Sequence, residues 1–149
     1  MHEIDDARTL LVVDDEELLL RLCLRILVPA GFRVLTADGG EAAVKICTEF
    51  QGSISVALLD VMMPKMSGPE LAPYVIKLHP ETSIVFMSGY EDYRLEKYRP
   101  FSFKWFLRKP FKPADLLAMI RIPLEEVKKR GPRREENVTY IRKAGGELS

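Results

Sequence analysis

The chain has 149 residues, of which 47% are hydrophobic and 30% charged, and its formal net charge is zero. This composition is typical of one folded domain, and the balanced charge argues against a nucleic-acid-binding surface. No apolar run approaches the ~20 residues that a membrane-spanning helix needs, and the polar N-terminus lacks a signal-peptide core. We therefore expect a cytoplasmic protein that binds neither nucleic acid nor membranes directly.

Strands and helices are predicted to alternate along the chain. Strands are expected at 9–13, 32–37, 55–60, 83–88 and 103–107, and helices at 16–27, 40–50, 68–78, 91–98 and from 112 onward. Strict alternation predicts an α/β fold, a doubly wound parallel sheet with helices on both faces. The uninterrupted apolar strands agree with this, because a strand covered by helices on both sides has no solvent-exposed face.

Three local features refine the helices. The first helix places Leu19, Leu22, Cys23 and Ile26 on one face, and Pro69 suits the first turn of the third helix. Cys23 and Cys47 lie in apolar helical patterns without a CxxC motif, so we expect reduced core residues and no zinc site.

The character of the chain changes near residue 121. Pro123 is expected to kink or stop the last helix. The following segment is charged, has few apolar residues and is too short for a second domain. We therefore expect one domain over residues 1–122, followed by a charged extension over 123–149 that is partly helical or disordered.

Polar residues follow four of the predicted strands. Asp14 and Asp15 follow the first strand, Asp60 ends the third, Ser88 ends the fourth and Lys109 follows the fifth. Since the carboxyl ends of parallel strands share one edge, which is where ligands bind in such sheets, these side chains are expected to converge.

The chemistry of this set favours a metal and a phosphoryl group. Close carboxylates repel one another unless a cation lies among them, and oxygen ligands without His or Cys favour a hard ion such as Mg²⁺. We expect Asp14, Asp15 and Asp60 as ligands, together with the backbone carbonyl of Met62. A carboxylate can act as a nucleophile and form an aspartyl phosphate, and Asp60 on the central strand is the best placed. Lys109 and the Ser88 hydroxyl would then help to neutralise and position the phosphoryl group.

Each residue also has a simpler interpretation. The acidic run at 14–16 can cap a helix and compensate its dipole. Asp60 can start a turn, Ser88 can be a loop hydroxyl, and Lys109 can be a surface lysine. All of these features fall at strand carboxyl ends and none at the opposite edge, which favours a shared site.

The motifs VVDDE, LLDVMMPKMSG, VFMSGY and FLRKPF occur in this order. From about Thr9 to Ile122 the chain resembles the receiver domain of two-component response regulators. MSGY and FLRKPF are especially similar to receivers attached to hybrid sensor kinases. The resemblance implies a flavodoxin-like (βα)5 fold with strand order 2-1-3-4-5. It also implies that Asp60 accepts a phosphoryl group, and that Asp14, Asp15 and the Met62 carbonyl hold Mg²⁺.

The resemblance assigns further roles near the last strand. It implies that Ser88 and Lys109 contact the phosphoryl group, that the bond from Lys109 to Pro110 is cis, and that Phe106 is the switch aromatic. Phosphorylation would then change the surface formed by the fourth helix, fifth strand and fifth helix. Met62 and Tyr90, which flank the phosphate in the family, offer no amide or carboxylate to position a water, so we expect slow self-dephosphorylation.

The implied partners are a cognate histidine kinase or phosphotransfer protein and a downstream effector that meets this switching surface. A phosphorylation-dependent homodimer stays open. The domain would catalyse only its own phosphorylation and dephosphorylation, and is otherwise not an enzyme.

Four alternative functions differ in the motifs that they require. A haloacid-dehalogenase-type phosphatase needs a second aspartate two residues after the first, where Met62 stands, and a P-loop enzyme needs a GxxxxGK[ST] motif that is absent. A phosphorylation-independent receiver-like interaction module remains as the alternative function. A DNA-binding output domain has no room after Ile122.

Overall fold

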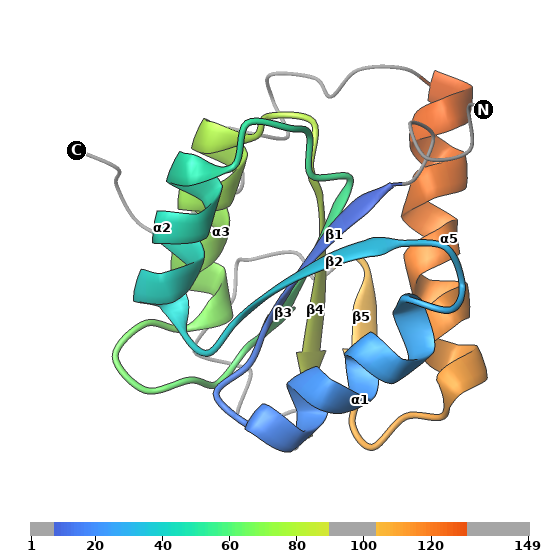
Figure 1. The fold of residues 1–149 in the computed structure, drawn as a ribbon, viewed down its shortest axis with the longest axis horizontal. Coiled ribbons are helices and arrows are strands. Elements are labelled where there is room, and N and C mark those ends of the chain that lie inside the picture. The colour runs from blue at the N-terminus through green and yellow to red at the C-terminus, as the bar shows by residue number, and fades with distance from the viewer. Residues whose placement is uncertain (1–7, 90–103, 131–149) are drawn as a thin grey trace.

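The computed structural model of the chain describes residues 8–89 and 104–130 (Figure 1). Its described strands form one parallel sheet in the order β2-β1-β3-β4-β5. They are β1 (Thr9–Val13), β2 (Arg33–Ala37), β3 (Val56–Asp60), β4 (Ser83–Ser88) and β5 (Phe106–Arg108). The predicted flavodoxin-like strand order is confirmed.

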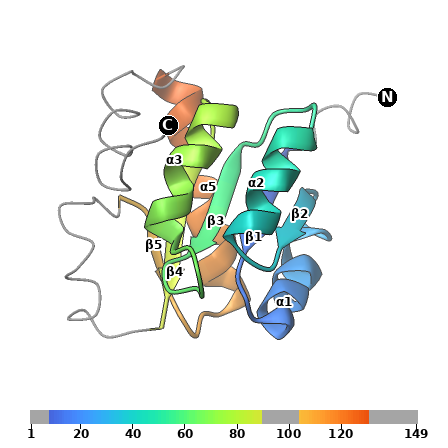
Figure 2. The ribbon, with the colours of Figure 1, turned by 90° about the vertical axis from the view of Figure 1, so that its left-hand side faces the viewer.

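Helices cover both faces of the sheet (Figures 1 and 2). They are α1 (Glu17–Leu27), α2 (Gly40–Glu49), α3 (Gly68–Leu78) and α5 (Pro113–Arg130). The helix predicted at 91–98 lies outside the described residues. Within the described part of the chain, no helix is both long and apolar enough to span a bilayer.

The central strands alternate their side chains between two cores. Leu11 and Val13 of β1 pack with α2 and α3 in one buried cluster, whereas Leu10 and Val12 pack with α1 and α5 in the other. This division follows from the period of two in a strand. Because β1, β3 and β4 are buried along their whole length, their polar groups can reach solvent only at strand ends.

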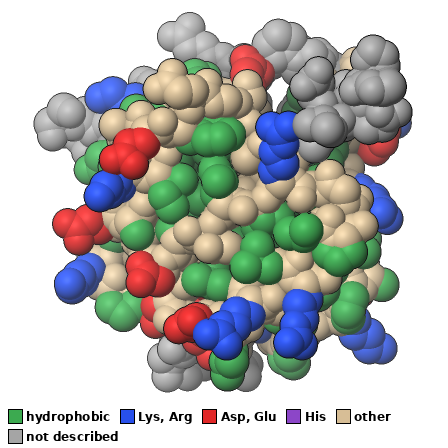
Figure 3. Space-filling view, viewed as in Figure 1, with side chains coloured by type: hydrophobic (Ala, Val, Ile, Leu, Met, Phe, Trp, Pro, Cys, Tyr) green, Lys and Arg blue, Asp and Glu red, His purple; other side chains and the backbone are tan. Residues whose placement is uncertain are grey.

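Among the described strands, β2 lies at the edge of the sheet and pairs with β1 alone. Its residues are less buried than those of the central strands, with Val34, Leu35 and Thr36 half-buried. Figure 3, drawn from the same side as Figure 1, shows hydrophobic side chains gathered on the face where this strand lies.

The connection from β3 into α3 is specified locally. Ser67 and Glu70 form a capping box, in which the Glu70 N–H donates to the Ser67 hydroxyl and the Ser67 N–H donates to the Glu70 carboxylate. A side chain at Gly68 would collide with the backbone carbonyl oxygen of Asp60. The loop is therefore packed directly under the end of β3, and α3 has the predicted bounds.

Two predictions about packing and strand bounds require correction. In α1, Leu20, Cys23 and Leu27 are buried, whereas Leu22, predicted to lie with Cys23, is 40% exposed. The buried face of α1 differs from the predicted one because leucines lie on several faces of this helix. The last strand begins at Phe106 and extends to Arg108, so Lys104 and Trp105 lie before it.

The expectation that Pro123 stops the last helix is wrong, because the helix continues to Arg130, and a kink at Pro123 stays a prediction. Packing outweighs the hydrogen bond that a proline removes: Pro123 is buried and Leu124 packs against the core cluster of α1 and α5. An ion pair of 2.6 Å between Glu126 and Lys104 also ties this part of α5 to the segment before β5.

Candidate functional site

The predicted residues meet at the carboxyl edge of the sheet. Asp14 directly follows β1, Asp60 ends β3 and Ser88 ends β4, and Lys109 directly follows β5. The Lys109 N–H donates to the Ser88 carbonyl over 2.9 Å, which fixes the start of the lysine against the neighbouring strand.

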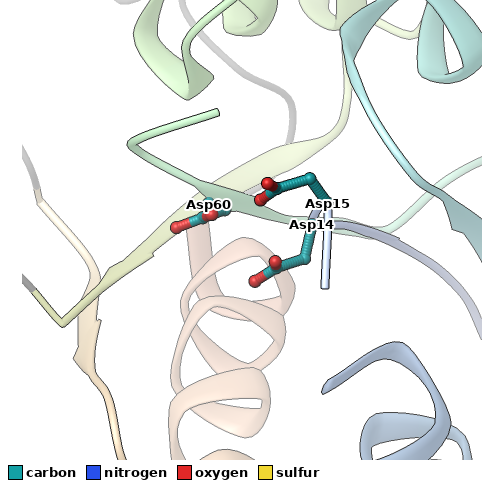
Figure 4. A group of neighbouring side chains, drawn as sticks. All are labelled: Asp14, Asp15 and Asp60. Atoms are coloured by element: carbon teal, nitrogen blue, oxygen red, sulfur yellow. The ribbon is translucent and has the colours of Figure 1, made fainter. Parts of the chain in front are cut away.

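Asp14, Asp15 and Asp60 form a compact acidic cluster (Figure 4). One carboxylate oxygen from each lies within 4.8 Å of the others. Asp14 is 0% exposed and Asp60 5% exposed, while Asp15 is exposed to solvent. Two of the three carboxylates are therefore held out of water.

The ammonium group of Lys109 reaches into this cluster. Its Nζ lies 2.6 Å from Asp14 Oδ2 and 3.3 Å from Asp60 Oδ1. The lysine and Asp14 are separated by 95 positions in the chain. The peptide bond between Lys109 and Pro110 is cis, as predicted.

Burial and mutual repulsion shift the pKa values of the carboxylates in the cluster. Burial, reinforced by the negative charge of Asp14, raises the pKa of Asp60 to about 7, although Lys109 opposes the change. The pKa of Asp14 is also raised, mainly by burial, against hydrogen bonds from Lys109 and the Glu16 backbone. Burial alone would lower the pKa of Lys109, but its bonds and attraction to Asp14 and Asp60 prevail and raise it.

This donor set fits a hard divalent cation. It offers carboxylate oxygens only, and one ammonium is too little to balance three carboxylates. The raised pKa of Asp60 shows that the cluster holds its negative charge at a cost, which a divalent ion would relieve.

The remaining predicted residues lie close by. Ser88 is fully buried. Met62 and Phe106 are half-buried and pack against the core cluster beneath α2 and α3, and Phe106 pairs with Phe86 of β4. The thiols of Cys23 and Cys47 are buried, and burial raises their pKa values to about 12 and about 11, which keeps both protonated and unreactive.

One neighbour of Lys109 was not assigned from the sequence. Glu16 Oε1 lies 3.7 Å from Lys109 Nζ. The acidic run at 14–16 was interpreted only as metal ligands or a helix cap. The sequence shows that a third acidic residue, Glu16, follows Asp15. It does not show that this residue contacts a lysine so far along the chain.

Comparison with known proteins decides the family. A family model described as the response regulator receiver domain matches residues 10–121. The chain belongs to the response regulator receiver domain family. This confirms the resemblance seen in the four motifs, and the matched range of the receiver domain contains every residue of the candidate site.

The curated relatives are longer than this receiver domain. It is 32% identical to the sensor kinase CckA of Brucella abortus over 83% of the chain but only 13% of the kinase. It is 34% identical to the probable transcriptional regulator ycf27 of Cyanidium caldarium, over 81% of the chain and 48% of the regulator. The chain therefore spans less than half the length of these relatives.

Two solved receiver structures align with this chain over almost their whole length. One is a receiver domain protein of Clostridium thermocellum, with a TM-score of 0.71 and 29% identity over 82% of this chain and 98% of that one. Another is a CheY-like receiver domain protein of Methanospirillum hungatei, with a TM-score of 0.74 and 27% identity over 85% and 100% of the two chains. The receiver domain is thus a signalling module of two-component systems.

Proposed function

We propose that this receiver domain accepts a phosphoryl group on Asp60, in a Mg²⁺-dependent step of two-component phosphorelay signalling. The observation that carries the proposal is the placement of the Lys109 ammonium between Asp14 and Asp60, 2.6 and 3.3 Å away. An anionic group attached to Asp60 would meet a fixed positive charge.

The proposed step is an in-line displacement. An Asp60 carboxylate oxygen attacks phosphorus, the bond from phosphorus to the donor breaks, and the donor leaves with that electron pair. The donor is the phosphohistidine of a histidine kinase or phosphotransfer protein, or acetyl phosphate, which leaves as acetate. Attack needs an ionised Asp60, and Lys109 stabilises that form.

Asp14, Asp15, Asp60 and the Met62 carbonyl would hold the metal. Bound Mg²⁺ would supply positive charge that offsets the charge of the transferred phosphoryl oxygens. The raised pKa of Asp60 supports this part of the proposal, because a carboxylate that resists ionisation gains most from added positive charge.

Phosphorylation adds negative charge where Lys109 already binds two carboxylates. We propose that Lys109 and the Ser88 hydroxyl move toward the phosphoryl oxygens, and that Phe106 turns inward as the switch. The surface of β5 and α5 would then meet a downstream effector. Phe106 supports this, because it stands at the start of β5 next to the core cluster and is only half-buried, so it still has exposed surface to bury.

Residues 1–122 are proposed as the receiver unit and 123–149 as an extension without a domain of its own, although α5 continues across the boundary. A cytoplasmic location is proposed for the chain as well.

Phosphorylation with a small donor tests the proposal. Wild type, Asp60→Asn and the control Asp38→Asn are incubated with acetyl phosphate, with Mg²⁺ or with chelator, and weighed intact by mass spectrometry. Asp38 is an exposed aspartate outside the cluster. We expect one phosphoryl group on wild type and control with Mg²⁺ only, and none on Asp60→Asn. An unmodified wild type would favour the phosphorylation-independent interaction module.

A further inference from the structure

Glu16 contacts the phosphate-binding lysine but has no part in the proposed function. Its Oε1 lies 3.7 Å from Lys109 Nζ, and 68% of its side chain is exposed. The other carboxylates around this ammonium, Asp14 and Asp60, are buried. Glu16 is therefore the carboxylate on the solvent side, from which a phosphoryl donor must approach.

Helix capping does not explain this position of the Glu16 side chain. Glu16 occupies the N-cap of α1, yet its side chain makes no capping hydrogen bond. Helix caps favour Ser, Thr, Asp and Asn. The backbone holds the residue in place instead: its N–H donates to Asp14 Oδ1 over 2.8 Å, and its carbonyl accepts from Leu19 and Leu20.

The neighbouring glutamate behaves differently. Glu17 on the first turn of α1 is slightly more exposed, at 74% of its side chain, but its carboxylate pairs with Arg21 one turn along the helix, at 2.9 Å. Two adjacent glutamates thus direct their charges to different partners, one within the helix and the other across to the site.

We propose that Glu16 is a positioning residue that competes with the incoming phosphoryl group for the Lys109 ammonium and thereby restrains phosphorylation of Asp60. This inference rests on the proposed function and concerns the regulation of the same site. When phosphorus bonds to Asp60 and acetate departs, Lys109 must turn toward the new oxygens and give up its contact with Glu16.

The size of the effect is limited by the exposure of Glu16, 68% of whose side chain is exposed, against 16% for Lys109. Exposed ion pairs contribute about 0.2–1 kcal/mol, so loss of Glu16 should speed phosphorylation by about 1.4- to five-fold. Since charges in water are screened by salt, the increase should shrink as ionic strength rises. A structural defect would slow the reaction and would not depend on salt in this way.

The test compares Glu16→Gln with wild type and with the matched control Glu17→Gln. Initial rates of phosphorylation by acetyl phosphate with Mg²⁺ are measured by intact mass at about 0.05 M and about 0.5 M salt, where screening lengths differ about three-fold. We expect an increase of about 1.4- to five-fold for Glu16→Gln at low salt, little change at high salt, and wild-type rates for Glu17→Gln. Equal or slower rates for Glu16→Gln at low salt overturn the proposal, as does an increase that salt leaves unchanged.

A second measurement does not depend on phosphorylation. In metal-free protein, the ¹³Cε resonance of Lys109 should move in Glu16→Gln and stay in place in Glu17→Gln. An unmoved resonance shows that Glu16 does not position the lysine and overturns the inference. If wild type accepts no phosphoryl group while the resonance moves, the proposed function fails and the contact between Glu16 and Lys109 stands.

Discussion

Replacing Asp60 by Asn should make the metal-free protein more stable, increasingly so as pH rises. Asp60 has a pKa of about 7 in the folded protein against 3.8 as its ordinary value. Between these values the folded state binds a proton that the unfolded state has released. The free energy of unfolding therefore falls as pH rises through this window, by about 1.4 kcal/mol per pH unit. Asparagine carries no charge at any of these pH values, so its contribution stays constant.

The gap in unfolding free energy between Asp60→Asn and wild type should widen by about 2–3 kcal/mol from pH 5 to pH 8. Urea unfolding followed by circular dichroism, with chelator present at each pH, measures it. Asp38→Asn is the control and is expected to follow the wild-type curve. Saturating Mg²⁺ should reduce the gap at pH 8, because an ion among the carboxylates stabilises the wild-type charge. A gap that stays constant with pH in chelator would refute the reasoning that burial raises the Asp60 pKa.

Three further substitutions test the loop after β3. Lys65 has a left-handed backbone with φ of 69°, so Lys65→Asn should raise the free energy of unfolding by about 0.5–1 kcal/mol, because asparagine tolerates this conformation; a lower melting temperature would contradict it. Gly68→Ala should lower the unfolding free energy by about 1–3 kcal/mol and slow phosphorylation, because the new methyl group meets the Asp60 carbonyl oxygen; wild-type stability and rate would show that the loop can adjust. Met62→Asn should shorten the lifetime of the aspartyl phosphate by giving a water an amide to bind, measured by mass after donor removal, and an unchanged lifetime would count against the expected slow self-dephosphorylation.

Local signals explain which elements were predicted well. Helix α3 has its predicted bounds because Ser67, Gly68 and Pro69 specify its start within a few residues. Strands β1, β3 and β4 were recognised because a doubly covered strand must be apolar throughout. Strand β5 was misplaced because the aromatic run before it resembles a strand, and its pairing with β4 decides where it begins.

The errors arise where packing overrides a local preference. Proline lowers the stability of a helix interior by ~3 kcal/mol, yet Pro123 stays within α5 because it is buried and its neighbours Leu124 and Glu126 contact the rest of the fold. Leu22 was placed in the core because a leucine-rich helix does not indicate by itself which of its leucines face the sheet.

The sequence by itself determined the parallel α/β fold and the residues that share one edge of the sheet. Strand alternation and chain order are enough for this, since every parallel strand ends on the same side. Only the tertiary structure decided that Lys109 binds Asp14 more closely than Asp60, that burial raises the Asp60 pKa to about 7, and that Glu16 reaches the lysine. Distances of this kind depend on how strands far apart in the chain are packed, and burial depends on every element that covers the site.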